Sequence, residues 1–142
     1  MPVNPIPEEY HTVTPYMIIK DVSGQLDFLE KAFNAKVTTR MEAPESGIMH
    51  AEVKIGDSTV MMGQADENYP PMPAMLYLYV VNVDDVYQQA LKAGAATVQE
   101  PEDQFYGDRT ANVRDPFGNL WGIATHVEDV SEEEMERRMQ QG

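Results

Sequence analysis

The spacing of apolar residues switches between the two-residue period of a strand and the longer period of a helix. Residues 12–20 (TVTPYMIIK) are β-branched and aromatic, which predicts a strand. Residues 22–33 carry one apolar stripe at three- and four-residue spacing, so we predict a helix that begins at Asp21 and stops at Asn34. Three more strands are predicted near residues 37–42, 49–55 and 59–62. The first half of the chain therefore predicts a βαβββ module.

The same order of elements returns after a linker rich in proline and acidic residues, at residues 65–74. A strand is predicted at residues 75–81 and a helix at 83–93, and strands follow near 97–100, 110–114 and 120–125. An offset of 61 positions pairs Val22 with Val83, Lys31 with Lys92, Ala32 with Ala93, Ala35 with Ala96 and Val37 with Val98. The sequence thus predicts an α+β fold made by tandem duplication, with modules at 12–64 and 75–126 in one domain of residues 1–142.

Composition narrows the class of protein. The 142 residues include no cysteine, which removes disulfides and Cys-bound zinc. The formal net charge of -14 disfavours nucleic acid and favours neutral or cationic ligands. The sequence shows neither a signal peptide nor an apolar run long enough for a membrane span. We therefore expect a cytoplasmic protein that binds neither nucleic acid nor membrane.

A further helix is predicted near residues 131–140. Ser131 and Glu134 have the spacing of a capping box at its start. Met135 and Met139 lie four residues apart and so share one face of this helix. We expect that face to pack on the domain or on a second subunit.

Alternation along the strands predicts which side chains leave the core. On residues 49–55 the apolar set, expected to face the helix, is Met49, Ala51, Val53 and Ile55, and the polar set is His50, Glu52 and Lys54. The equivalent strand of the second module has the polar set Thr110, Asn112 and Arg114. Because each module leaves one sheet face bare, the two modules are expected to form a curved mixed sheet around a ligand trough. Taken alone, each polar row is equally well explained as a solvated face.

The second module holds further candidate contacts. In residues 120–126 (LWGIATH) bulky side chains alternate with small ones, and Gly122 indicates either a face left open for a ligand or a bulge or close backbone approach. In the connector QFYGDR, Phe105 and Tyr106 are candidate ligand contacts. Asp108 and Arg109 are expected to make structural hydrogen bonds instead.

The stretch KDVSGQLDFLEKAFNAKV and the block EDQFYGDRTANVRDPFGNLWGIATHVEDVSEEEM resemble the vicinal oxygen chelate superfamily, whose members include glyoxalase I, bleomycin-resistance proteins and extradiol dioxygenases. The PhnB-like branch is the most similar, and the resemblance extends over nearly the whole chain. It implies a homodimer and metal ligands on the first and last strands of each module. Those positions fall near Thr14, Val60 or Met61, Leu76 and Gly122. None is a His, Glu or Gln, so the usual metal chemistry is not expected.

Three functions remain open. The first is a protein without metal or other cofactor that binds a small cationic or aromatic organic molecule, with sequestration implied by the resemblance to bleomycin-resistance proteins. The second is a lyase, isomerase or dioxygenase with a metal relocated to His50 and Glu52. The third is a structural or regulatory dimer with a vestigial trough. The expected ligand contacts are Tyr16, His50, Glu52, Leu76, Phe105, Tyr106, Asn112, Arg114 and Gly122, whereas His11 and His126 are expected to take no part.

Overall fold

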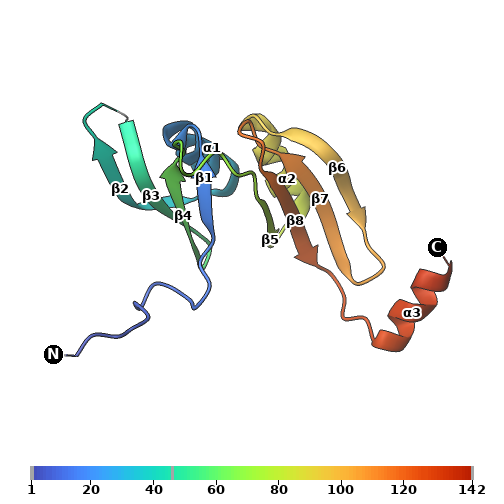
Figure 1. Ribbon diagram of the computed structural model, residues 1–142. Coiled ribbons are helices and arrows are strands. Elements are labelled where there is room, and N and C mark those ends of the chain that lie inside the picture. The colour runs from blue at the N-terminus through green and yellow to red at the C-terminus, as the bar shows by residue number, and fades with distance from the viewer. Residues whose placement is uncertain (1, 46, 142) are drawn as a thin grey trace. The chain divides into compact units, whose positions relative to one another are not determined.

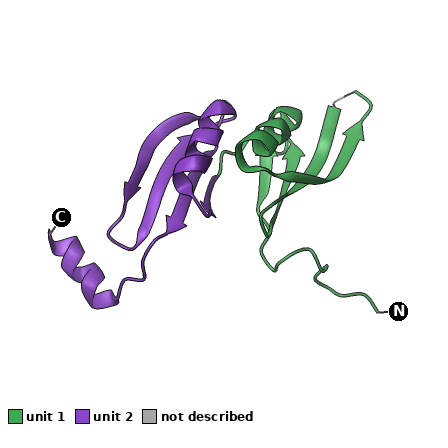
Figure 2. Cartoon of the chain, turned by 180° about the vertical axis from the view of Figure 1, so that it is seen from behind, with its two compact units in different colours: residues 1–74 green, residues 75–142 purple. Residues whose placement is uncertain are grey.

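The structure, a computed structural model, describes residues 2–45 and 47–141 and divides the chain into two compact units, Met1–Ala74 and Met75–Gly142 (Figure 2). The elements of unit 1 are β1 Tyr16–Ile19, α1 Val22–Phe33, β2 Lys36–Ala43, β3 Gly47–Ile55 and β4 Ser58–Gln64 (Figure 1). Those of unit 2 are β5 Met75–Tyr79, α2 Val83–Lys92, β6 Ala96–Asp103, β7 Asp108–Arg114, β8 Leu120–His126 and α3 Glu132–Gln141. The predicted α+β fold of two βαβββ modules and a C-terminal helix is confirmed.

The two sheets repeat one pairing scheme. Their strand orders are β1-β4-β3-β2 and β5-β8-β7-β6, and in each the first and last strands of the module pair in parallel. Tyr16 pairs with Met61, and Tyr77 pairs with Gly122, so each pair is separated by 45 positions. The equal register supports the predicted duplication.

The helices begin and end where local side-chain chemistry predicts. The Asp21 side chain accepts a hydrogen bond from the Gly24 N–H at 3.0 Å, and the Asn82 side chain accepts one from the Asp85 N–H at 3.2 Å. Both residues satisfy an N–H group that the helix itself leaves unpaired. Helix α1 ends at Asn34, which adopts a left-handed φ of 57°. None of the described helices is long and apolar enough to cross a membrane.

The core of each unit lies between its helix and one face of its sheet. In unit 1 the apolar strand residues buried on this face include Met17, Ile19, Ala51, Val53, Val60 and Met62, which lie with Leu26, Leu29 and Ala32 of α1. In unit 2 they include Ala111, Val113, Trp121 and Ile123, which lie with Val83, Tyr87 and Ala90 of α2. We call the opposite face of each sheet its open face.

One strand departs from the predicted alternation. Met49 is 55% exposed, and Ile48 is buried in its place. Strand β2 pairs Met41 with His50 and Glu42 with Ile48, so a bulge leaves Met49 without a partner in this ladder. Because a bulge inserts one extra residue, it reverses which residues face the core. The prediction that Met49 faces the helix is therefore wrong.

A buried carboxylate organises the turn between β7 and β8. Oδ2 of Asp115 accepts from Nε1 of Trp121 at 2.9 Å, and Oδ1 accepts from the backbone N–H groups of Phe117 at 2.9 Å and Asn119 at 3.0 Å. Asp115, Asn119 and Trp121 are all buried. The carboxylate therefore satisfies donors that would otherwise be buried without a partner.

We predict that Asp115→Ala lowers the free energy of unfolding by at least about 2 kcal/mol, because it leaves the indole and two backbone donors unsatisfied. Urea unfolding followed by far-UV circular dichroism measures the change. The matched control is Asp57→Ala in the corresponding hairpin of unit 1, where the exposed carboxylate accepts a 3.0 Å bond from the Ser58 hydroxyl. Asp57→Ala is expected to lower the free energy of unfolding by under about 0.5 kcal/mol. Equal losses in both variants would contradict the role of Asp115.

Candidate functional site

Tyr16, His50 and Glu52 meet on the open face of unit 1. The register places Tyr16 beside Met61, and Met61 beside Glu52 on the next strand. Oη of Tyr16 lies 3.1 Å from Nδ1 of His50, and Nε2 of His50 lies 2.9 Å from Oε2 of Glu52. Three predicted ligand contacts therefore form one chain of hydrogen bonds.

The segment before β1 adds a fourth member to this chain. The Tyr10 hydroxyl donates to Oε1 of Glu52, and the Thr59 hydroxyl donates to the Glu9 carbonyl at 3.0 Å. Burial raises the pKa of Glu52, but the hydrogen bonds from His50 and Tyr10 outweigh it and hold the pKa below its ordinary value. Glu52 is therefore an ionised acceptor at neutral pH.

A second buried carboxylate lies on the open face of unit 2. Asp108 is 3% exposed, and its Oδ2 accepts from the hydroxyls of Tyr77 at 2.9 Å and Tyr79 at 2.8 Å. Its Oδ1 lies 2.9 Å from Nδ1 of His126. Burial raises the pKa of Asp108, but these three hydrogen bonds outweigh it and hold the pKa below its ordinary value. Each open face thus contains a buried, ionised carboxylate bonded to tyrosine and histidine.

His126 connects Asp108 to the segment after β8. Its Nδ1 faces Asp108, and its Nε2 lies 2.7 Å from Oδ1 of Asp129. Because ionised carboxylates only accept hydrogen bonds, both ring nitrogens must donate, and the imidazole is protonated in this arrangement. The bonds to Asp108 and Asp129 accordingly raise the pKa of His126 above its ordinary value.

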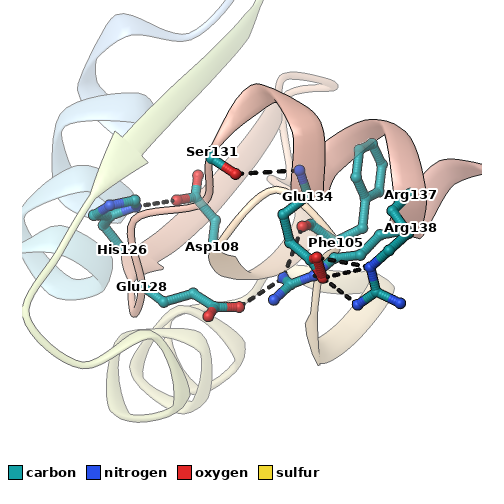
Figure 3. A network of polar contacts seen from close by, with 8 residues as sticks. All are labelled: Phe105, Asp108, His126, Glu128, Ser131, Glu134, Arg137 and Arg138. Carbon is teal, nitrogen blue, oxygen red and sulfur yellow. Dashed lines mark hydrogen bonds and ion pairs between the residues drawn. The ribbon is translucent and has the colours of Figure 1, made fainter.

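The connector between β6 and β7 binds the C-terminal helix. Arg138 of α3 donates to the Phe105 carbonyl at 3.0 Å and pairs with Glu128 at 2.7 Å (Figure 3). The Ser131 hydroxyl accepts from the Glu134 N–H at 3.2 Å, as the predicted helix start requires. No residue of α3, all of which are described, is buried. Packing of its methionine face on a second subunit stays a prediction.

Gly122 makes room for a tyrosine ring. A Cβ added at Gly122 would lie 2.8 Å from the Tyr77 ring and 3.2 Å from Oδ1 of Asn112. In unit 1, a Cβ added at Gly63 would lie 2.6 Å from the Tyr16 hydroxyl. The group that lies closest to Gly122 is thus the Tyr77 side chain, and in the described part of the chain neither a bulge nor a neighbouring backbone occupies this position.

Polar side chains on the open face of unit 2 form a row beside this tyrosine. Nδ2 of Asn112 donates to Oε1 of Gln99 at 2.9 Å, and Nε2 of Gln99 donates to Oγ1 of Thr110 at 3.2 Å. Gln104 donates to the same hydroxyl at 3.1 Å. The predicted contact Asn112 is therefore held in place by its neighbours on β6 and β7.

Four predicted contacts fall in three different places. Leu76 pairs with Trp121, a core residue, and so lies on the face that the helix covers. Arg114 is exposed and donates to the Gly118 carbonyl at 3.0 Å. In the connector, the ring of Phe105 packs edge to face on that of Tyr106, with centroids 5.2 Å apart. Tyr106 lies near Tyr77, whose pKa is raised by burial first, then by Asp108 and by Tyr106. The structure thus brings Tyr106 to the Asp108 group and leaves Leu76 away from it.

The side chains present do not fit the metal site that the resemblance implies. Its four ligand positions hold no metal-binding donor. At the alternative position, both ring nitrogens of His50 and both carboxylate oxygens of Glu52 already have protein partners. Among residues 2–45 and 47–141, no three His, Asp or Glu side chains are grouped to hold a metal. No reaction step is therefore assigned to a metal.

Sequence analysis missed five members of these groups: Tyr10, Tyr77, Tyr79, Asp108 and His126. Two-residue spacing in MLYLY was a usable signal, since it places both β5 tyrosines on one sheet face. The same two-residue spacing places His126 on one face of β8 with Gly122 and Ala124. Asp108 was expected to make structural bonds, and it does. For Tyr10 there was no signal, because its partner lies 42 positions away.

Comparison with known proteins identifies the family. The model of the Glyoxalase/Bleomycin resistance protein/Dioxygenase superfamily matches residues 10–123. This match includes the first βαβββ module and the second as far as Ile123 in β8. The chain belongs to this superfamily, as the sequence resemblance predicted.

Individual relatives agree with this assignment. The chain is 33% identical over 141 residues to the uncharacterized protein Mb0911c of Mycobacterium bovis, with 89% of this chain and 91% of that protein covered. TioX from Micromonospora sp. ML1 is 25% identical, with a TM-score of 0.72 over 82% of this chain and 99% of that one. A glyoxalase/bleomycin resistance protein/dioxygenase family enzyme from Burkholderia phytofirmans PsJN shares the fold at 19% identity, with a TM-score of 0.63 and coverage of 79% and 95%.

His126 predicts a pH-dependent contribution to stability. Its folded pKa lies above the ordinary 6.5, so its contribution is complete below that pH and is lost as pH rises through the folded pKa. We expect the free energy of unfolding of the native protein, measured by urea unfolding, to fall relative to that of His126→Gln as the pH rises above the ordinary pKa of about 6.5. His11 and His50 remain in both proteins, so the difference reports His126. A difference independent of pH would exclude the protonated bridge.

The contact between Gly122 and Tyr77 predicts a coupled pair of substitutions. Gly122→Ala is expected to destabilise the protein by about 1–3 kcal/mol, because the added methyl group displaces the Tyr77 ring and its bond to Asp108. In a protein that already carries Tyr77→Ala, Gly122→Ala should leave the free energy of unfolding almost unchanged. Urea unfolding of the four proteins gives this coupling energy. Equal costs in both backgrounds would show that another group limits the space.

Proposed function

We propose that this protein binds a small basic or aromatic organic molecule on the open faces of its sheets, without a metal. The observation that carries the proposal is the pairing of tyrosine rings with a buried carboxylate on both faces. In unit 1 the carboxylate is Glu52, bonded to Tyr10, and in unit 2 it is Asp108, bonded to Tyr77 and Tyr79. Aromatic rings held beside a negative charge favour cations and planar ligands.

The tyrosines of unit 2 keep accessible ring surface for such a ligand. Tyr77 is 43% exposed and Tyr79 is 65% exposed, and their rings lie edge to face with centroids 5.3 Å apart. Their hydroxyls are fixed on Asp108 at the same time. Fixing an aromatic side chain in advance reduces the entropy that binding would otherwise cost.

Charge and family both support this proposal. The formal net charge of -14 draws basic molecules toward the protein. The superfamily's name includes bleomycin resistance, which supports sequestration as the use of such binding. The single trough, the homodimer and the cytoplasmic location expected from the sequence stay predictions.

A thermal-shift screen tests the proposal. Basic aromatic compounds are expected to raise the melting temperature in a concentration-dependent way, because a ligand that binds only the folded state stabilises it, by about 2.7 kcal/mol at a hundredfold excess over Kd. Acidic analogues of the same compounds are expected to give no shift. If no basic or aromatic compound produces a shift, the proposal fails.

Matched variants locate the binding. Tyr79→Ala removes an exposed ring from the open face of unit 2 and is expected to reduce the shift. Tyr69→Ala removes a similarly exposed ring, 62% exposed, from the linker and is expected to leave the thermal shift unchanged. Equal shifts in both variants would place the ligand away from Tyr79.

A further inference from the structure

We propose that Tyr16, His50 and Glu52 form a metal-free proton relay that removes a proton from a molecule bound on the open face of unit 1. This inference rests on the proposed function, since it assigns chemistry to one of the two binding faces. It takes up the same histidine and glutamate that the metal alternative would use, but in a different role.

The direction of the relay follows from Glu52. Glu52 is 7% exposed as a residue, and its carboxylate accepts from Tyr10 on one oxygen and from His50 on the other. An ionised carboxylate cannot donate, so the proton of neutral His50 sits on Nε2. The lone pair on Nδ1 then points at the Tyr16 oxygen, 3.1 Å away, and Tyr16 donates to it. The arrangement orients a basic nitrogen toward a phenol, as a carboxylate orients the histidine of a catalytic triad.

Solvent exposure decreases along the relay, from Tyr16 through His50 to Glu52. Tyr16 is 51% exposed, whereas the side chains of His50 and Glu52 are 20% and 10% exposed. A ligand on the open face therefore meets the phenol first and the carboxylate last. Gly63 leaves the space that the Tyr16 hydroxyl occupies, because a Cβ there would lie 2.6 Å from it. Tyr16 is thus positioned between solvent and His50.

The proposed step conserves atoms and charge. A lone pair on the Tyr16 oxygen takes a proton from the ligand, while the original hydroxyl proton moves to Nδ1 of His50. The ligand keeps the electron pair of the broken bond, and His50 becomes an imidazolium stabilised by Glu52. The substrate class is a neutral or cationic carbon acid, because Glu52 and the net charge of -14 repel anions.

Unit 2 contains the same residue types but cannot perform this step. Both ring nitrogens of His126 face carboxylates, at 2.9 and 2.7 Å, so neither keeps a basic lone pair. Its tyrosines donate to Asp108 rather than to the imidazole. The relay is therefore assigned to unit 1 alone.

The probe for this proposal is 5-nitrobenzisoxazole, a neutral carbon acid. A base removes its C–H proton, the C–H electron pair completes a nitrile, and the N–O pair leaves on oxygen as a coloured phenolate. We expect the full-length protein to catalyse the elimination reaction of this probe faster than free imidazole does at the same concentration.

Variants separate the relay from simpler explanations. Tyr16→Phe and His50→Gln are each expected to lower kcat by at least about tenfold with little change in KM. The control His11→Gln removes a histidine outside both groups and is expected to leave kcat unchanged. Far-UV circular dichroism confirms that each variant folds. If Tyr16→Phe keeps the full rate while His50→Gln loses it, His50 acts directly and the relay is wrong.

The remaining outcomes distinguish this inference from the proposed function. If the native protein is no faster than free imidazole, although basic aromatic compounds still raise its melting temperature, the relay is overturned and binding stands. If the probe reacts as expected while no basic or aromatic compound gives a thermal shift, the relay stands and the proposed ligand class is wrong.

Discussion

Parallel pairing of the first and last strands in each unit determines which side chains meet on the open face. The shared register sets Tyr16 beside Met61 and Tyr77 beside Gly122. A slip of one residue would exchange the two faces and turn both tyrosines into the core. In the observed register each ring instead lies against a glycine, Gly63 or Gly122, and reaches a polar partner. The chemistry of both faces therefore depends on a backbone pairing that the apolar core fixes.

The two units combine tyrosine, histidine and carboxylate in different orders, and the order determines the charge of the imidazole. In unit 1, His50 lies between a phenol and a carboxylate, so it needs one proton only and keeps one basic nitrogen. In unit 2, His126 lies between Asp108 and Asp129, so it needs two protons and carries a positive charge. One imidazole is suited to accept a proton, and the other to hold a carboxylate and the C-terminal segment together. Duplication thus supplied two similar sheets that differ in protonation chemistry.

The sequence predicted what local patterns encode. Apolar periodicity placed the helices and strands. The capping side chain of Asp21 and the left-handed backbone of Asn34 marked the ends of α1, and strand alternation put His50 and Glu52 on one face. Periodicity does not encode a bulge, which is why Met49 was assigned to the wrong face. Leu76 was expected at the site because a family resemblance put a ligand position near it, and such a position does not say which way the side chain points. In the structure Leu76 lies on the covered face. Contacts between distant segments depend on the folded backbone, so neither pattern could reveal them.

Tyr10 shows why such a distant contact matters for the site. A buried carboxylate remains ionised only when hydrogen bonds replace the water that it has lost. Glu52 receives one of its two side-chain bonds from Tyr10, a residue outside both βαβββ modules, and the Glu9 carbonyl accepts from Thr59 beside it. The ionisation of Glu52, and through it the tautomer of His50, is therefore coupled to the placement of the segment before β1.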